Sequence, residues 1–442
     1  MQLYSNIVFF NIPYCILFIP YSIGAAFALG KIPIAATDFG IPVWYSYADE
    51  EQSVDLPTFS LEYDINNDNT IGNGGAYIPF VKRAMVVANR TLRLQATMDY
   101  APQWMLNTTT PLPSPDLNTT LLGALATYYY KFYHELLAND VPLEAIALFN
   151  ELTDSYMNAS YENTRDLLVD HVKPLFNQMA IANNETVPKL TFTAKFGRRI
   201  TNDASPAFYE MSGTQESTDV IFFHGYDCNY GPAEGMGWQC NDLNNLNTSC
   251  PYLHESALAM KQFYDSYGQD RQLWMTEVCY ASEFGDYNTS NGCPDLPRFD
   301  FDDAMQWGDM LFVDFNVIGV SGWLYWNLIL DMSGGPWLKS PKHNDPMSNP
   351  QQPIIVVDPS SGEYYHTGVY YAMSHFSKYI SAGNAIRINI TPMETTTNYP
   401  TIQYTAFVND INIEKGIYDK VAIVILMNND LESHDISLKL NN

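Results

Sequence analysis

The stretch Gln272-Leu273-Trp274-Met275-Thr276-Glu277-Val278-Cys279 decides how the rest of the chain is interpreted. It is an apolar, strand-like run that delivers a single carboxylate, Glu277, at its end. A buried carboxylate is costly unless it has a partner. A second apolar run, residues 143–149, is followed directly by Asn150 and Glu151. The sequence therefore predicts two glutamates at the C-terminal ends of two buried strands.

Similar apolar runs, rich in β-branched residues, alternate along the chain with amphipathic segments of helical spacing. Continuous apolar runs are typical of parallel strands that are covered on both faces. The predicted strands are residues 29–35, 92–98, 143–149, 190–196, 220–224, 273–278 and 317–326. The predicted helices are residues 78–88, 121–138, 164–182, 255–267 and 302–315. Repeated β-α units predict a (β/α)8 TIM barrel, whose eighth strand comes from the N-terminal stretch or is absent.

The pattern changes after Trp337. A strand at 354–357 and a helix at 370–379 are followed by strands at 385–390, 401–408 and 420–427, separated by turn residues. This indicates an all-β, sandwich-like side domain packed beside the barrel. The predicted domains are an apolar N-terminal stretch at 1–30, a catalytic barrel at 31–345 and the side domain at 346–442.

The first thirty residues contain no charged side chain. The stretch is long enough to span a bilayer. It also resembles a signal peptide, although Pro13 and Pro20 interrupt it and a basic region is missing. A buried part of the fold, or a replaced or truncated N-terminus, is the third alternative, and the sequence leaves all three open.

The chain of 442 residues carries a formal net charge of -27. No basic stripe is present to neutralise phosphates, so nucleic acid is excluded as a partner, and simple docking on anionic lipid is disfavoured. Eight Asn-x-Ser/Thr sequons favour passage through the secretory pathway to a lysosomal or extracellular location. They begin at Asn89, Asn107, Asn118, Asn158, Asn184, Asn247, Asn288 and Asn389.

The six cysteines include no Cys-x-x-Cys pair, and His254-Glu255 lacks the second histidine of a metalloprotease motif. No metal and no cofactor are predicted. Disulfides among Cys228, Cys240 and Cys250 are plausible, but their connectivity stays open. Cys279 is expected to be a small buried residue.

Two carboxylates at the mouth of a barrel suit the hydrolysis of a glycosidic bond. One donates a proton to the leaving oxygen and the other attacks the anomeric carbon; a separation of about 5 Å gives retention of configuration. The alternative is that Glu151 and Glu277 are structural carboxylates. His224 is expected to be structural, because two carboxylates suffice for the reaction.

An ordered set of motifs resembles glycoside hydrolase family 30, and within it the lysosomal glucosylceramidases. The set covers the chain from residue 31 to about residue 430. The matching segments are Asn150-Glu151 and residues 31–39, 101–105, 274–279, 322–331, 334–336, 353–358 and 375–380. Each motif is weak alone, but the ordered set is highly specific.

The resemblance implies that Glu151 is the general acid/base and Glu277 the nucleophile. It implies that Asn150 binds the 2-hydroxyl of the sugar and that Asp38 accepts hydrogen bonds from distal hydroxyls. The remaining implied substrate-binding residues are Trp104, Tyr226, Trp326 and Asn327.

The chain departs from the family pattern at several places. Lys31 stands where the family usually has arginine, Asp99 stands in the place of a sugar-contacting tryptophan, and Gly225 replaces a bulky aromatic residue. The first barrel strand of the family, rich in glycine and alanine, is not visible, and a last side-domain strand is expected to be missing.

The resemblance implies hydrolysis of a β-glucosidic bond, glucosylceramide being the expected substrate. A lipid-presenting helper protein is a possible partner, and membrane contact would come only through the lipid substrate. Two alternatives stay open. One is an inactive or truncated homologue that binds a sugar or a partner without turnover, and the other is a family member acting on a different β-glycoside.

Overall fold

The computed structural model describes residues 24–37, 45–51, 53–65, 77–107, 116–152, 157–193, 197–226, 253–268, 270–279, 297–335, 351–380, 385–388, 402–414 and 417–429. All statements below concern these residues. They include no helix that is both long and apolar enough to cross a bilayer. Asp38, the three loop cysteines Cys228, Cys240 and Cys250, and most of the N-terminal stretch lie outside them.

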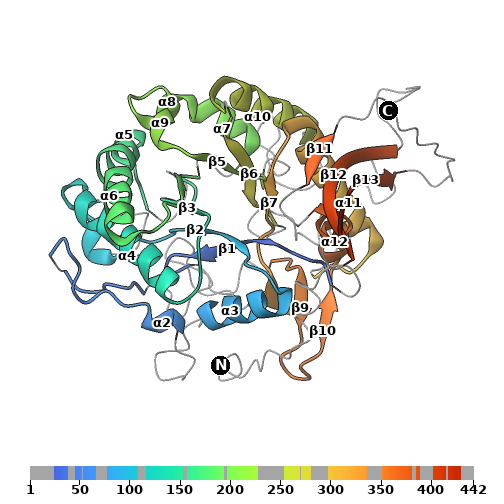
Figure 1. The fold of residues 1–442 in the computed structure, drawn as a ribbon, viewed down its shortest axis with the longest axis horizontal. Coiled ribbons are helices and arrows are strands. Elements are labelled where there is room, and N and C mark those ends of the chain that lie inside the picture. Colours follow the sequence, from blue (N-terminus) through green and yellow to red (C-terminus); the bar gives the residue numbers. More distant parts are fainter. Residues whose placement is uncertain are drawn as a thin grey trace, which may run out of the picture.

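Seven parallel strands form the wall of a barrel in the described part of the chain, with helices around the outside (Figure 1). Two hydrogen-bonded sheets, β1-β2-β3-β4 and β5-β6-β7, are connected by a single parallel bridge between Thr193 and Phe222. The strands are β1 Leu29–Pro33, β2 Arg93–Thr97, β3 Ala145–Ala147, β4 Lys189–Thr191, β5 Val220–His224, β6 Gln272–Glu277 and β7 Gly322–Trp323. The (β/α)-barrel class predicted from the sequence is confirmed.

Strands β7 and β1 approach each other through side chains. A Cβ atom added at Gly322 would lie 3.0 Å from Leu29 and 2.7 Å from Trp274, so a glycine is needed at this point of the wall. Among the described residues, no strand pair joins β7 to β1. The seven strands found therefore match the seven that the sequence predicts.

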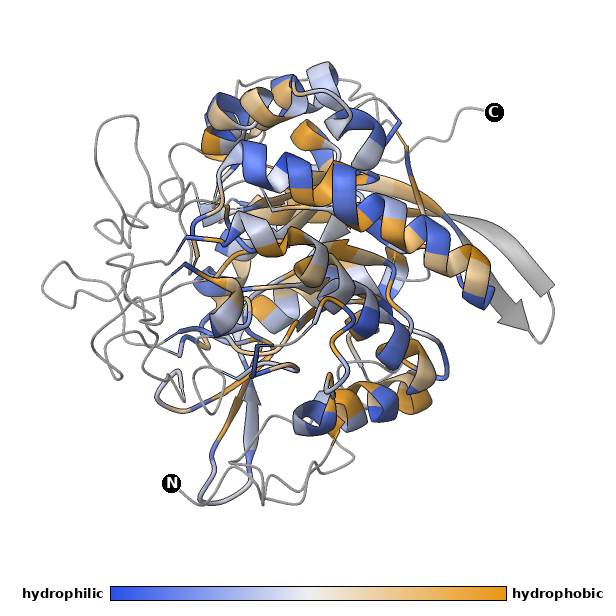
Figure 2. Cartoon of the chain, turned by 90° about the vertical axis from the view of Figure 1, so that its left-hand side faces the viewer, coloured by the Kyte–Doolittle hydropathy of each residue, from blue (hydrophilic) through white to orange (hydrophobic). Residues whose placement is uncertain are grey.

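Helices cover the strands with their apolar faces inward, as the hydropathy colouring of Figure 2 shows. Helices α4 and α10 bury apolar side chains against the barrel. Helix α11 begins at Phe301, and the side chain of the preceding Asp300 caps it by accepting a hydrogen bond from the Asp303 amide. Helical segments of the barrel are α2 Glu62–Ile65, α3 Tyr77–Ala88, η2 Gln103–Met105, η3 Thr119–Leu121, α4 Leu122–Ala138, α5 Tyr161–Arg165, η4 Asp166–Val172, α6 Lys173–Asn183, α7 Arg198–Ala204, α8 Pro206–Tyr209, α9 Thr214–Ser217, α10 Leu253–Tyr267, α11 Phe301–Val313 and η8 Asp314–Ile318.

The predicted strand at 317–326 is wrong in its first half. Residues Asp314–Ile318 continue α11 as a wider helical turn, and only Gly322–Trp323 form a strand. Gly319 ends the helix with a φ of 84°, a conformation that glycine adopts without strain. The β-branched run misled the prediction because the helix extends into it. The short helices α7, α8 and α9 between β4 and β5 were also not predicted.

The C-terminal region forms two small sheets beside the barrel. Strand β8 Ile329–Asp331 pairs with β9 Ile355–Val357, which pairs with β10 Tyr364–His366. Strand β12 Ile402–Glu414 pairs with β11 Ile386–Ile388 and β13 Ile417–Asn428, all antiparallel. Phe407 packs edge-on against Phe315 at 5.7 Å, which holds the second sheet to the barrel. The predicted β side domain is confirmed, although β8 and β10 were not predicted.

Helix α12 (Gly368–Ile380) lies within the segment assigned to the side domain, yet it packs along the barrel helix α11. Phe376 contacts Phe312 at 5.2 Å and stacks on Phe315 at 5.5 Å. The domain limits at 30 and 345 stay a prediction.

Three layers fill the inside of the barrel. Charged and polar side chains lie at the N-terminal ends of the strands. A buried apolar layer follows, formed by Ala145, Ala147, Val220, Phe222 and Trp274. A second polar layer lies at the C-terminal ends, where catalytic groups of such barrels are found.

Candidate active site

Both glutamates predicted as catalytic lie at the C-terminal mouth of the barrel. Glu277 is the last residue of β6, and Glu151 follows β3 by four positions. Glu151 has a φ of 51°, a left-handed conformation that is strained for a residue with a side chain. Strain of this kind persists where the surrounding structure fixes it, and it concentrates at functional sites. The two side chains present oxygens within 4.8 Å of each other.

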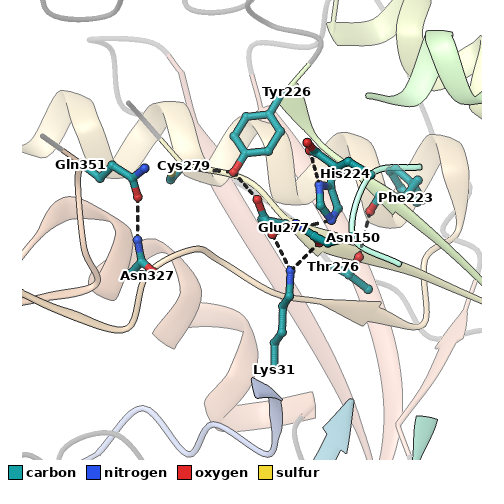
Figure 3. A network of polar contacts seen from close by, with 11 residues as sticks. Lys31, Asn150, Phe223, His224, Tyr226, Thr276, Glu277, Cys279, Asn327 and Gln351 are labelled. Atoms are coloured by element: carbon teal, nitrogen blue, oxygen red, sulfur yellow. Dashed lines mark hydrogen bonds and ion pairs between the residues drawn. The ribbon is translucent and has the colours of Figure 1, made fainter. Parts of the chain in front are cut away.

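Glu277 is held by three polar neighbours (Figure 3). Lys31 forms an ion pair with Oε2, and the Tyr226 hydroxyl donates a hydrogen bond of 2.8 Å to Oε1. Burial raises the pKa of Glu277, but the charge of His224, together with the charge and hydrogen bond of Lys31, lowers it further than burial raises it. The net pKa therefore lies below the ordinary value, which favours the ionised carboxylate.

Tyr226 keeps its hydroxyl proton, which it donates to Glu277. Burial raises the pKa of its phenol well above the ordinary value, and the neighbouring Cys279 and Glu277 raise it further. Cys279 is buried as expected, with its sulfur 3.8 Å from the Tyr226 oxygen.

Lys31 connects three groups of the site. Its Nζ donates to Asn150 Oδ1 at 3.1 Å, pairs with Glu277 and lies 5.1 Å from the ring centroid of Trp326. A lysine offers a point charge where arginine would offer a planar fork. This residue was noted from the sequence only as a departure, and the structure places it at the centre of the network.

Glu151 has His224 as its polar partner in the described part of the chain. Nδ1 of His224 lies 2.6 Å from Glu151 Oε1, and Nε2 lies 3.7 Å from Glu277 Oε2. His224 is fully buried. The histidine expected to be structural thus lies between the two glutamates.

The remaining predicted residues have different surroundings. Asn327 donates to Gln351 at 2.6 Å, and Trp104 donates from its indole nitrogen to the Ala48 carbonyl at 2.8 Å. Within the part of the chain that the structure describes, these hydrogen bonds do not connect Asn327 or Trp104 to the two glutamates. Asp38 lies outside the described residues. Glu151, Glu277, Asn150, Tyr226 and Trp326 are the members of the predicted site that share one network, through Lys31 and His224.

A buried ion pair supports the strand end that carries His224. Arg198 of α7 forms a two-pronged pair with Asp314 of η8, at 2.9 and 2.7 Å, and both side chains are fully buried. Arg198 also donates to the Gly225 carbonyl at 3.0 Å. A Cβ at Gly225 would meet Arg198 Nη2 at 3.2 Å and Val278 at 3.1 Å, which explains the glycine there. The sequence reasoning missed this pair, because residues 116 positions apart carry no common motif.

Within the described residues, Glu151, His224 and Glu277 are also the set whose donor atoms lie close enough to hold a metal ion. The Lys31 ammonium already neutralises Glu277 in that set. A divalent cation would have to displace it, so the arrangement favours an acid–base site over a metal centre.

This arrangement of a barrel and its paired glutamates can be compared with known proteins. The family description "Glycosyl hydrolase family 30 TIM-barrel domain" matches residues 18–161 and 254–380, more than half of the chain. The chain belongs to glycosyl hydrolase family 30. The family expected from the sequence motifs is therefore confirmed.

Curated relatives of this family member are distant. A Caenorhabditis elegans protein named "Putative glucosylceramidase 4" is 26% identical over 94% of the chain and 70% of its own length. "Lysosomal acid glucosylceramidase" of Mus musculus is 23% identical over 84% of the chain and 64% of its own length. The chain spans between 60% and 70% of the length of the curated relatives it matches.

Solved structures agree on the fold. SrfJ from Salmonella typhimurium superposes with a TM-score of 0.67 at 15% identity, covering 95% of the chain and 78% of that protein. The endo-β1,6-glucanase BT3312 gives a TM-score of 0.63 at 17% identity, with coverages of 94% and 84%. At this identity the likeness concerns the fold alone.

Proposed function

We propose that this family 30 member is a retaining β-glycosidase that works by double displacement. The observation that carries the proposal is the separation of the two glutamates, whose oxygens lie within 4.8 Å of each other. Retaining glycosidases need carboxyl groups about 5–5.5 Å apart, whereas inverting enzymes need about 6.5–9.5 Å to admit a water molecule.

Glu277 is the proposed nucleophile. Its lowered pKa supports this role, because only the carboxylate can attack the anomeric carbon. As its oxygen bonds to that carbon, the bond to the leaving oxygen breaks and Glu151 supplies the proton. Water then attacks the same carbon, Glu151 takes a proton from it, and Glu277 is released as carboxylate.

Substrate binding is proposed for the residues around this pair. Asn150 is 8% exposed and linked to Lys31, which suits a contact to the 2-hydroxyl beside the nucleophile. Trp326 offers a ring face next to the Lys31 charge. Asn327, Trp104, Tyr226 and Asp38 complete the proposed substrate-binding set.

Glucosylceramide is the proposed natural substrate, hydrolysed to glucose and ceramide. The names of the curated relatives support this choice. Contact with the membrane would then come through the lipid, with a lipid-presenting helper protein as partner. A second candidate, another β-glycoside, is favoured by the glycine at 225, where Arg198 occupies space next to the backbone, and by the lysine at 31.

A lysosomal or extracellular location is proposed as well. Asn89, Asn107, Asn158 and Asn184 of the sequons are exposed. Burial raises the pKa of Asp64 to about 6 and that of Asp303 to about 7. Carboxyls with raised folded pKa values stabilise the protein fully below their unfolded pKa, and this contribution is lost as pH rises through the folded value. Both groups therefore favour the folded state in an acidic compartment.

The test of the proposed reaction is covalent labelling with a 2-fluoro-β-glucoside followed by peptide mass spectrometry. Glu277 should carry the label, and Glu277→Gln should carry none. Turnover accompanied by labelling of another residue would refute the assignment. Aryl β-glucosides, aryl β-xylosides and dispersed glucosylceramide, assayed side by side, decide between the substrates. A wild type that hydrolyses none of them would favour the non-hydrolysing homologue.

A further inference from the structure

Strands β5 and β6 change register at the mouth of the barrel. Phe223 pairs with Met275, one step before the site. The next pair joins His224 to Glu277, which leaves Thr276 as an extra residue on β6. The Thr276 hydroxyl donates to the Phe223 carbonyl at 3.3 Å (Figure 3). An extra residue of this kind is a β-bulge, and bulges beside active sites redirect neighbouring side chains. The bulge therefore sets the direction of the Glu277 side chain.

Gly225 closes this bulge from the β5 side. Its N–H donates to the backbone carbonyl of Glu277 at 2.8 Å, and its own carbonyl accepts from Arg198 Nη1 at 3.0 Å. The next residue, Tyr226, donates its hydroxyl to Glu277 Oε1 at 2.8 Å. The short segment after β5 thus holds Glu277 twice, once through the backbone and once through the phenol.

The anchor of the Gly225 carbonyl is a fully buried ion pair. Arg198 donates to both oxygens of Asp314, at 2.9 and 2.7 Å, and neither side chain is exposed. The Trp323 indole of β7 donates to Asp314 as well, at 2.8 Å. Taking two charges out of water is so costly that apolar side chains of similar volume often serve stability equally well. Stability alone therefore accounts poorly for this pair.

The glycine and the arginine fit each other closely. A Cβ at residue 225 would lie 3.2 Å from Arg198 Nη2 and 3.1 Å from the Cβ of Val278. A bulky side chain at residue 225, which the family resemblance leads one to expect, would displace the guanidinium from the carbonyl that it binds. In this chain the guanidinium occupies the space beside the backbone that such a side chain would need.

We infer that Arg198 is a positioning residue for the proposed nucleophile. Anchored by Asp314, it fixes the Gly225 carbonyl and thereby keeps the β5–β6 bulge closed. A closed bulge keeps the Tyr226 hydroxyl on Glu277 Oε1. The inference rests on the proposed glycosidase function. Because a misplaced carboxylate attacks poorly, loss of this support should slow the chemical step more than it weakens substrate binding.

The kinetic test separates positioning from stability. Arg198→Met leaves Asp314 buried without its counter-charge and should destabilise the protein strongly. Adding Asp314→Asn removes that charge, while the asparagine oxygen can still accept from Trp323, so the urea midpoint should recover. In this double variant kcat on an aryl β-glucoside should nevertheless stay on the order of 10–100-fold below wild type, with KM changed only a few-fold. A kcat that recovers together with stability would overturn the inference.

A second ion pair provides the matched control. Lys173 pairs with Asp219, which directly precedes β5, so this pair lies at the opposite end of the same strand. Lys173→Met with Asp219→Asn should leave kcat unchanged. An equal loss of kcat in the control would show that any disturbance of β5 slows the reaction, and it would refute a specific role for Arg198.

A milder variant tests the link to the phenol. Arg198→Lys keeps a charge for Asp314, but a lysine lacks the planar fork that reaches Asp314 and the Gly225 carbonyl together. Its kcat should fall. Combined with Tyr226→Phe, the loss should be smaller than the product of the two single losses, because both changes act on one carboxylate. Losses that multiply would contradict the inference.

A last measurement does not need turnover. Hydrogen exchange followed by mass spectrometry reports on the backbone amides of residues 220–226, which include the Gly225 N–H. In Arg198→Lys and in the double variant, this peptide should exchange up to about 10-fold faster, the factor of one lost hydrogen bond. A peptide from α4 should keep its wild-type rate. Unchanged exchange of residues 220–226 refutes the inference. A wild type inactive on every glycoside refutes the proposed function, and this exchange still decides whether Arg198 holds the bulge.

Discussion

The two ends of the barrel each carry a cluster of charges, and the clusters differ in sign. At the N-terminal end, Glu144 is bound by both Arg93, at 2.5 and 2.7 Å, and Lys189, at 2.7 Å. Lys189 also donates to Gln272. Two cations therefore share one carboxylate, and the charged side chains satisfy one another.

Trp274 separates this end from the site above it. Arg93 lies 5.4 Å and Lys189 lies 5.7 Å from its ring centroid, and Phe222 stacks on it at 5.2 Å. The cations thereby gain a ring face as well as a carboxylate. This end of the barrel is built for stability.

At the C-terminal end the proportion is reversed. Glu277 pairs with one permanent cation, Lys31 (Figure 3), and the contacts of His224 reach both Glu151 and Glu277. An excess of carboxylate suits a glycosidase, because positive charge develops on the sugar ring in the transition state. The same barrel strands therefore end in two different charge clusters, one with an excess of cations at the N-terminal end and one with an excess of carboxylates at the C-terminal end.

A glutamate-to-glutamine substitution should affect turnover at the C-terminal end of the barrel and leave it unaffected at the N-terminal end. Glu277→Gln should lower kcat by about 10⁴-fold or more, because the nucleophile is lost. Glu144→Gln should leave kcat unchanged. Both variants should keep native circular dichroism. A large loss in Glu144→Gln would remove the functional distinction between the ends.

The next test removes one lysine from each end of the barrel, Lys31 from the C-terminal end and Lys189 from the N-terminal end. Lys31→Met should lower kcat/KM by about 10–100-fold, since a charge-assisted hydrogen bond is worth about 1.5–3 kcal/mol. Loss of the Lys31 charge should also raise the pKa of Glu277, which moves the acid limb of the pH profile upward. The acid limb of the pH profile should stay at the wild-type position in Lys31→Arg and in Lys189→Met. A limb that stays in place in Lys31→Met would show that Lys31 does not control the nucleophile.

Stability should respond mainly at the N-terminal end. Glu144→Ala leaves Arg93 and Lys189 half-buried without their carboxylate, and it should lower the free energy of unfolding by about 1–3 kcal/mol. Urea denaturation at neutral pH measures the change. If Glu144→Ala lowered kcat as well as the free energy of unfolding, the two ends of the barrel would be coupled.

The smallest expected effect concerns pH. Burial raises the pKa of Glu144, but hydrogen bonds from Arg93 and Lys189 outweigh it and leave the pKa below its ordinary value of 4.5. A lowered folded pKa contributes stability above the unfolded pKa, and this is lost as pH falls through the folded value. Denaturation curves of wild type should therefore weaken more between neutral pH and about pH 3 than those of Glu144→Gln. Parallel curves would contradict the pairing.

Prediction from sequence succeeded where local patterning is strong. Strand Val220–His224 and helix Leu122–Ala138 were placed within a residue or two. The strand is a continuous apolar run because it is buried on both faces, and the helix has helical spacing of its apolar residues. It failed at 317–326, where a β-branched run continues a helix. Short helices such as α8 (Pro206–Tyr209) have too few residues to show a period.

The candidate site was predicted unevenly for a related reason. Glu151 and Glu277 stand out as single carboxylates at the ends of apolar runs, and the family motifs named Tyr226 and Asn150. Lys31 was noted only as a departure from the family's arginine and His224 only as a structural residue, because their roles depend on contacts with residues 246 and 73 positions away along the chain.

The sequence by itself determined the barrel, the side domain, the family and the two glutamates, since each follows from periodicity or from motifs in order. Only the tertiary structure decided the spacing of the glutamates, the Lys31 ion pair and the place of His224 between them. The physical reason is that strand ends meet through closure of the barrel, which no local stretch encodes. Glu277 was visible as the end of one strand, but its charge state is set by side chains from β1 and β5.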